Sequence, residues 1–150
     1  MDIELLRADV SSLKVDAIVN PANPQLLAGY TPRPAAGEAI ITEGGNLFCK
    51  FVIHAVVPRM GEGNEEAKLR SATWSSLQRA EELALSSVAF PALAAGVFGI
   101  SFERCARIML AAAIDFRAQA RSVRRVVFCL FGKDPYDDFD RVLRELRPTS

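Results

Sequence analysis

The sequence has little of what marks a membrane protein or a nucleic-acid-binding protein. Its 150 residues carry 18 Lys and Arg against 18 Asp and Glu, so it lacks the excess of basic charge with which proteins neutralise phosphates. We therefore expect no double-stranded nucleic acid as a partner. It also lacks an apolar run long enough to cross a bilayer, and its acidic start, residues 1–4, differs from a signal peptide. We expect a soluble protein without a membrane partner.

Cysteine and histidine are scarce as well. Cys49, Cys105 and Cys129 stand far apart in apolar surroundings, and an odd, scattered set indicates reduced, buried thiols in the cytoplasm rather than a disulfide framework. Their spacings fit no zinc site, and no His or Asp accompanies them in a nucleophile pattern. The single histidine, His54, lies within an apolar run, where a hydrogen-bonded core histidine is a better interpretation than a general base. We expect no metal and no cofactor.

What the sequence does contain is the pattern of one α/β domain over residues 1–150. Half of the residues are apolar and 24% are charged, as in ordinary globular proteins. Apolar, β-branched runs alternate with stretches of helical period, so helices are expected on both faces of a sheet. The expected strands cover residues 3–6, 17–20, 38–42, 51–57, 88–91 and 124–130. The expected helices cover residues 65–85, 102–116 and 136–146.

A few residues predict where these elements begin and end. Pro21 cannot donate a hydrogen bond to a neighbouring strand, so the second strand is expected to stop before it. Asn64 is the expected N-cap of the first helix, and Ser101 is the expected N-cap of the second. In the second helix, an apolar stripe that faces the core is expected to begin at Phe102 and to end at Phe116.

The turn from Ala92 to Ile100 is the first candidate for ligand binding. Gly96 and Gly99 allow positive φ or a close approach of the backbone to a ligand, and the start of the following helix favours an anionic group. Phe98 is flanked by small residues and poorly placed for the core, so it could pack on a sugar or a base. The spacing matches neither the Walker nor the Rossmann pattern. From the residues alone, a plain strand-to-helix turn remains the better interpretation.

Two further turns follow expected strands. Asn20 and Asn23 carry amides that can both donate and accept, which suits ribose hydroxyls or a positioned water. Asn-Pro pairs also mark plain turns, and that alternative stays open. Asp9, at the exit of the first strand, either caps the turn at Ser11 or accepts a hydrogen bond from a ligand amine, and capping is the commoner role.

In their order along the chain, these segments resemble the macrodomain family, whose members bind ADP-ribose. The Asn-x-Ala-Asn block at residues 20–23 and the Gly-Val-Phe-Gly block at residues 96–99 are the most specific parts. The resemblance runs nearly from end to end, and implies a three-layer α/β/α sandwich with a mixed central sheet. Its further matching segments are residues 8–10, 15–19, 37–42, 46–47, 51–56 and 90–95.

The resemblance also implies roles for single residues. Asp9 would bond the adenine amine, with the Val10 amide nearby, and Phe131 would pack on the adenine. The loop from Ala94 to Phe98 would hold the diphosphate through backbone amides, with Phe98 against the distal ribose. Asn23 would contact that ribose and hold the attacking water, as the catalytic residue of hydrolytic members. The ligand-binding set is Asp9, Val10, Asn20, Ala94, Ala95, Gly96, Val97, Phe98, Gly99 and Phe131.

One part of the family pattern is missing from this sequence. After residues 26–29, a typical member continues into a glycine-rich turn and a helix that carries a catalytic acid. Here only residues 30–36 precede the next matching segment, and their two prolines exclude that helix. Water activation is then reduced to Asn23, which cannot act as a general base. Glu38 and Glu43 are the carboxylates that could replace the acid if they faced the cleft.

The expected function is therefore binding of ADP-ribose or an ADP-ribosylated protein, with weak hydrolysis of ADP-ribosyl esters or O-acetyl-ADP-ribose. One alternative is a full hydrolase of the same substrates. The other is a degenerate macrodomain that binds a nucleotide or a protein without catalysis. A monomer is expected, and dimerisation through the truncated region is the alternative, because loss of a helix should bare apolar surface.

Overall fold

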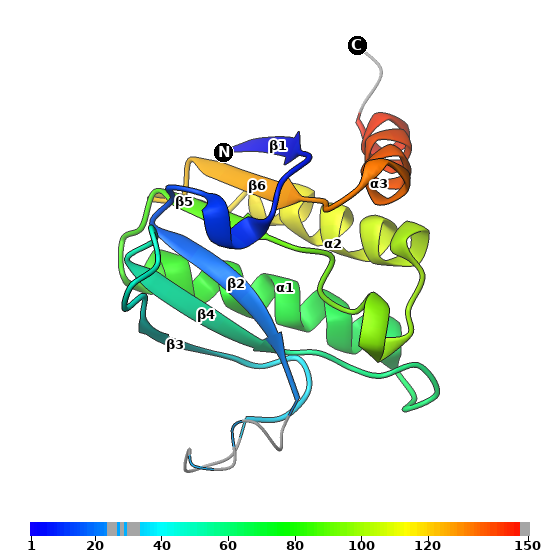
Figure 1. Ribbon diagram of the computed structural model, residues 1–150, viewed down its shortest axis with the longest axis horizontal. Coiled ribbons are helices and arrows are strands. Elements are labelled where there is room, and N and C mark those ends of the chain that lie inside the picture. The colour runs from blue at the N-terminus through cyan, green and yellow to red at the C-terminus, as the bar shows by residue number, and fades with distance from the viewer. Residues whose placement is uncertain (24–26, 28, 30–33, 148–150) are drawn as a thin grey trace.

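Parallel strand pairing organises the structure. The computed structural model describes residues 1–23, 27, 29 and 34–147, and within them six strands form one sheet in the order β1-β6-β5-β2-β4-β3. The strands are β1 (Asp2–Leu6), β2 (Ala17–Ala22), β3 (Ala39–Glu43), β4 (Phe51–Val56), β5 (Ser87–Phe90) and β6 (Arg125–Cys129). The helices are η1 (Val10–Ser12), α1 (Glu65–Glu82), η2 (Gly96–Phe98), α2 (Phe102–Phe116) and α3 (Lys133–Leu146), all shown in Figure 1.

The pairing brings the ends of several strands together. Every neighbouring pair is parallel except β3 with β4. The carboxyl ends of β1, β6 and β5 are therefore neighbours at one edge of the sheet, and the loops that follow these strands lie side by side. That edge is where open α/β sheets bind their ligands.

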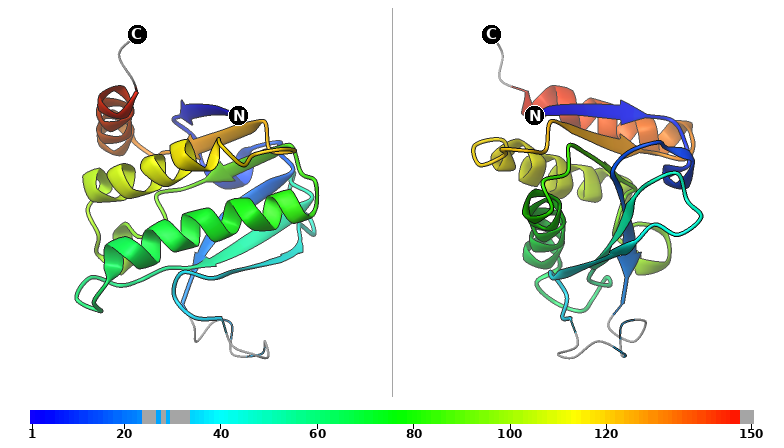
Figure 2. Two further views of the ribbon diagram at one scale, coloured as in Figure 1. Left: turned by 180° about the vertical axis from the view of Figure 1, so that it is seen from behind. Right: turned by 90° about the vertical axis from the view of Figure 1, so that its left-hand side faces the viewer.

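The three long helices of the described chain lie on one face of the sheet (Figure 2). α1 lies over β4 and β3, and α2 packs between α1 and α3. An ion pair joins α2 to α3, since Nη1 of Arg107 lies 2.8 Å from Oε2 of Glu145. Aromatic rings tie α3 to the sheet: Phe128 stacks on Phe90 at 5.4 Å between centroids, and Phe139 of α3 lies 5.9 Å from Phe128. The main core is the apolar layer between these helices and the sheet.

The opposite face has a lighter cover within the described residues. η1 and the loop 44–50 lie over a small apolar cluster that includes Ile18 and Val127. Toward β3 the face carries both polar and apolar groups. Asn20 is in register with His54, and the Thr42 hydroxyl is 2.9 Å from His54 Nε2. Ala22, Leu27 and Val56 form a further apolar cluster there, with Ile40 packed against it. The predicted α/β fold with a mixed sheet is confirmed, with the long helices on one side. Where loss of a helix was expected to bare apolar surface, the described part of the face carries this apolar cluster, with Ile40 half-buried, beside the polar Asn20, His54 and Thr42.

One predicted strand end is wrong. β2 continues through Pro21 to Ala22 instead of stopping at Asn20. The carbonyl of Ala22 accepts a hydrogen bond from the Val57 amide at 3.1 Å. The backbone polar groups of Ala22 therefore point toward β4, and those of Pro21, the preceding residue, point toward the other side of β2. On that side β5 pairs with β2 only at Ala17 and Ile18. The missing N–H of Pro21 therefore removes no bond from the sheet.

The two expected helix caps differ in outcome. The Ser101 hydroxyl accepts the Arg104 amide at 3.2 Å and caps α2, as predicted. Asn64 is the N-cap residue of α1, as predicted, but it has φ 56 and its side chain makes no capping bond. Instead, the carboxylate of Glu65 reaches back to the Gly61 amide at 2.8 Å. The loop before α1 is thus held by the first helical residue rather than by the cap.

Two more predictions from composition can be compared with the structure. Cys49, Cys105 and Cys129 are buried and unpaired, as expected. Among the described residues, no helix combines the length and the apolar character that a membrane span requires.

Candidate functional site at the strand ends

A pocket of about 360 Å³ lies where the loops after β1, β5 and β6 meet, and we name it the strand-end pocket. It is lined by Ala8, Asp9, Val10, Pro91, Ala92, Ala95, Gly96, Phe102, Cys129, Leu130 and Phe131. Most of these side chains are apolar, and Asp9 is the charged residue among them. The lining suits a flat, largely apolar ligand that carries a hydrogen-bond donor.

Asp9 has both a local structural role and a place in the strand-end pocket. Its Oδ1 accepts hydrogen bonds from the amide and the hydroxyl of Ser11, at 3.0 and 2.8 Å. These bonds cap η1 and lower the pKa of the Asp9 carboxyl below its ordinary value. The carboxylate is therefore ionised at neutral pH and acts as an acceptor. The predicted capping role is confirmed.

The loop between β5 and α2 is shaped by two glycines. Gly96 has φ 65 and Gly99 has φ 86, both in the left-handed region that other residues avoid. A side chain at Gly99 would also come within 3.1 Å of the Met60 Cβ. Glycine at these positions lets the chain pass through η2 and brings Ala95 and Gly96 to the strand-end pocket.

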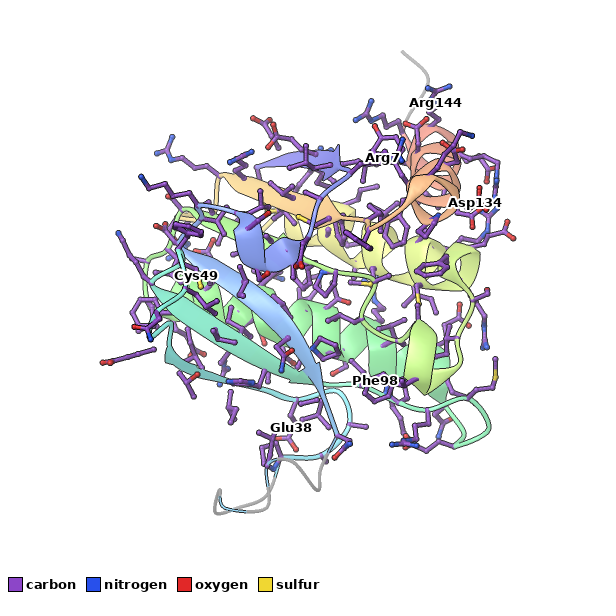
Figure 3. The ribbon with its side chains drawn as sticks, viewed as in Figure 1. Arg7, Glu38, Cys49, Phe98, Asp134 and Arg144 are labelled. Carbon is purple, nitrogen blue, oxygen red and sulfur yellow. The ribbon has the colours of Figure 1, made fainter. Side chains whose placement is uncertain are left out.

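Phe98 does not have the position that its sequence context predicts. Phe98 is the last residue of η2 and is labelled in Figure 3; its side chain is only 7% exposed and belongs to the main core. The guanidinium carbon of Arg59 lies 5.8 Å from the ring centroid, and the Met60 amide donates to the Phe98 carbonyl at 2.8 Å. The prediction that Phe98 is poorly placed for the core is wrong, because η2 turns this residue inward and leaves Val97 87% exposed.

Two exposed aromatic residues border the strand-end pocket. Phe131 follows β6 and is 83% exposed, and Phe102 opens α2 and is 36% exposed. The expected core stripe of α2 is buried at Cys105, Met109 and Phe116, but it does not extend to Phe102. The assignment of Phe102 to the core is therefore wrong.

Cys129 contributes a neutral part of the pocket wall. Burial raises the pKa of its thiol to about 12. A thiol with such a pKa carries almost no thiolate at neutral pH, so Cys129 offers apolar surface rather than a nucleophile.

The asparagine turn lies apart from the lining of the strand-end pocket. Asn20 is exposed on β2, and its Nδ2 is 3.5 Å from the His54 Nδ1. The Thr42 hydroxyl is 2.9 Å from the other ring nitrogen of His54. His54 is hydrogen-bonded, as predicted, but it is half-buried rather than a core residue. Burial lowers the pKa of the ring, which keeps it neutral at pH 7. Asn23 directly follows β2 and is half-buried.

The two carboxylates considered as replacement acids lie near β3. One oxygen of Glu38 accepts the Ala35 amide at 2.8 Å, and Glu43 is exposed at the end of β3. The stretch predicted to be non-helical, residues 30–36, falls mainly outside the described residues, because residues 30–33 are not among them.

The structure brings part of the predicted set together. The strand-end pocket is lined by five predicted residues: Asp9, Val10, Ala95, Gly96 and Phe131. Five others are not in its lining: Asn20, Ala94, Val97, Phe98 and Gly99. Ala92 begins the turn that was the first candidate from the sequence, and sequence reasoning missed five further lining residues: Ala8, Pro91, Phe102, Cys129 and Leu130. Most of these stand at the ends of predicted strands, so the rule that ligands bind at carboxyl ends could have found them.

A mixed sheet with a ligand-sized pocket at the ends of its parallel strands defines an α/β domain suited to binding a small molecule. A family model described as the Macro domain matches residues 32–109. A macro domain-containing protein of Caldanaerobacter subterraneus subsp. tengcongensis is 34% identical over 170 aligned positions, which cover 96% of this chain and 97% of that protein. The chain belongs to the macro domain family.

Solved structures agree with this membership. A mutant of the Oceanobacillus iheyensis macrodomain matches with a TM-score of 0.88 and 26% identity, covering 96% of this chain and 92% of that chain. The Trypanosoma brucei macrodomain in complex with ADP-ribose matches with a TM-score of 0.84 and 27% identity. The second match covers 93% of this chain and 68% of the other.

The alignment with the Caldanaerobacter relative also shows a difference in length. It spans 170 positions, whereas this chain has 150 residues, so at least 20 positions of the relative have no counterpart here.

Proposed function

We propose that the chain binds ADP-ribose, with the adenine in the strand-end pocket and the diphosphate along the loop from Ala95 to Phe98. Membership of the macro domain family supports this, as does the Trypanosoma brucei relative that is in complex with ADP-ribose. The observation that carries the proposal is the convergence of Asp9, Gly96 and Phe131 on one pocket from three strand ends.

Recognition of the base rests on Asp9 in this proposal. An ionised carboxylate accepts hydrogen bonds and donates none, so it favours an exocyclic amine over a carbonyl oxygen at the same place. The Val10 amide is the neighbouring donor for a ring nitrogen. Phe131, with most of its ring exposed, offers an apolar face on which the base can lie. Together these groups favour adenine over a base with a carbonyl at that position.

The diphosphate is held without a basic side chain in the pocket lining. Gly96 and Gly99 allow the loop backbone to approach the phosphates closely. The start of α2 lies directly after this loop, and its positive dipole end favours an anion. The balanced charge of the chain suits a site of this kind, in which backbone groups rather than lysines or arginines bind the phosphates.

A slow hydrolysis of ADP-ribosyl esters or O-acetyl-ADP-ribose is the secondary activity that we propose. Asn23 would orient a water at the distal ribose, and the water would attack the ester carbonyl, releasing the acid and ADP-ribose. The step is slow because an amide cannot take the proton, which passes to solvent. Of the two other candidate bases, Glu38 accepts the Ala35 amide on one oxygen, and the ring nitrogens of His54 contact Thr42 and Asn20.

Isothermal titration calorimetry with ADP-ribose tests the binding proposal. Saturable heat with one site per chain is expected, and no heat at high micromolar ligand with a folded sample would contradict it. The Asn23→Ala variant then separates binding from turnover. It should still bind ADP-ribose while its release of acetate from O-acetyl-ADP-ribose falls to background. Equal release from both forms would remove Asn23 from the reaction.

A binding module without catalysis is the second candidate. It is favoured by the at least 20 positions of the Caldanaerobacter relative that have no counterpart in this chain. Its ligand would be ADP-ribose on its own or attached to a protein, met by the same pocket. Wild-type protein that binds ADP-ribose but releases no product would select this candidate. The three buried, unpaired thiols support a cytoplasmic setting for either one.

A further inference from the structure

The position of Phe102 is not explained by the packing of its helix. It is the first residue of α2, and the four residues that follow it on the apolar stripe, Cys105, Met109, Ala112 and Phe116, are at most 1% exposed. Phe102 itself is 36% exposed. Covering exposed phenyl surface lowers the free energy of the system, and a cluster of such surface often marks a binding site.

The ring of Phe102 lies at the strand-end pocket together with Phe131. The two residues come from different elements, since Phe131 follows β6 and Phe102 begins α2. Pro91 and Leu130 add further apolar lining, and Asp9 adds one acceptor. Two aromatic rings and one acceptor are the groups that a flat heteroaromatic ring with an amine can use.

We propose that Phe102 forms a second aromatic contact for the base of the bound nucleotide and raises the preference for purines over pyrimidines. This inference rests on the proposed function. A purine has two fused rings and presents more area for stacking than a pyrimidine, so a second phenyl contact adds more to its binding. The buried side chains of Cys105 and Met109 anchor the first turns of α2, so the backbone that carries Phe102 is fixed beside the pocket before the ligand arrives.

The test compares variants of the full chain in titrations with ADP-ribose, AMP and CMP. Phe102→Ala removes the ring, and Phe102→Tyr keeps it. Phe48→Ala is the matched control, because Phe48 is also an exposed phenylalanine, at 69%, on the loop 44–50. That loop lies at the amino end of β4, where Figure 3 labels Cys49, away from the strand-end pocket. Melting temperatures are recorded for every variant.

Phe102→Ala should weaken the binding of ADP-ribose and of AMP about fivefold to tenfold, as expected for loss of one base-stacking ring. CMP should be weakened less, so the ratio of AMP to CMP affinity should fall. Phe102→Tyr and Phe48→Ala should keep both the affinity and the ratio of wild type. The proposal would be overturned if the ratio of AMP to CMP affinity is the same in Phe102→Ala as in wild type. This holds if the affinities are unchanged, and also if they fall equally for all ligands together with the melting temperature.

The proposal and the function on which it rests can fail separately. If wild type binds ADP-ribose and Phe102→Ala binds it equally well, only the role of Phe102 is lost. If wild type does not bind ADP-ribose but binds AMP in a Phe102-dependent way, the base site stands and the proposed function falls. If it binds none of the three ligands, both fall.

Discussion

Replacement of Phe131 by alanine should weaken ADP-ribose binding and leave the fold intact. The ring is 83% exposed, so its removal should change the free energy of unfolding by less than about 0.5 kcal/mol. Stacking of a base on an aromatic side chain contributes about 1–3 kcal/mol. We take the lower half of that range, about 1–2 kcal/mol, because the outer face of Phe131 stays in water. At about 1.4 kcal/mol per factor of ten, the dissociation constant should rise about 5- to 30-fold.

Calorimetry with ADP-ribose and thermal melts of the same samples check this prediction. The melting temperature of Phe131→Ala should stay within about 2 °C of wild type. Phe48→Ala removes a ring of similar exposure, 69%, from the loop 44–50 and should change neither quantity. The reasoning is refuted if Phe131→Ala binds as tightly as wild type, or if the control loses as much affinity as the variant.

Three further predictions concern titratable groups. Burial disfavours the charge of Glu81, but hydrogen bonds from the amides of residues 121–123 outweigh it and lower the pKa. Glu81→Gln should therefore lower the free energy of unfolding by about 1–2 kcal/mol at neutral pH. In urea unfolding, this difference from wild type should become smaller as the pH falls through the lowered pKa. Burial lowers the pKa of His54 from 6.5, so its contribution to stability is complete above that pH and is lost as the pH falls through the folded-state pKa. Between about pH 7 and pH 5, wild type should lose more stability in urea than His54→Gln, and equal losses would contradict this. Burial raises the thiol pKa of Cys105 to about 11 and that of Cys129 to about 12. Iodoacetamide should leave both unmodified in native protein at about pH 8, as read by mass spectrometry, and rapid alkylation would contradict their burial.

The strands and long helices could be predicted because their signals are local. Apolar, β-branched runs and helical spacing do not depend on distant contacts. The end of β2 could not be predicted in the same way. Whether Pro21 interrupts a strand depends on which neighbour its nitrogen faces, and that follows from the pairing of β2 with β5 and β4.

The candidate site shows the same division in its aromatic residues. Asp9 and Phe131 both line the strand-end pocket, Asp9 three residues after the end of β1 and Phe131 two residues after the end of β6. The predictions for Phe98 and Phe102 were both wrong. The sequence pattern assigned Phe98 to the surface and Phe102 to the core, but in the structure Phe98 is buried and Phe102 is exposed. Gly96 and Gly99 have positive φ at the two ends of η2, and within this turn Phe98 faces inward and Val97 faces solvent. Spacing along the chain does not reveal how such a turn orients its side chains.

A structure of the protein crystallised with ADP-ribose tests the central claim most directly. The account predicts the adenine in the strand-end pocket, its amine at the Asp9 carboxylate and its ring on Phe131. It also predicts the diphosphate along the backbone of the loop that begins at Gly96. ADP-ribose bound elsewhere on the molecule, or an empty strand-end pocket at saturating ligand, would contradict it.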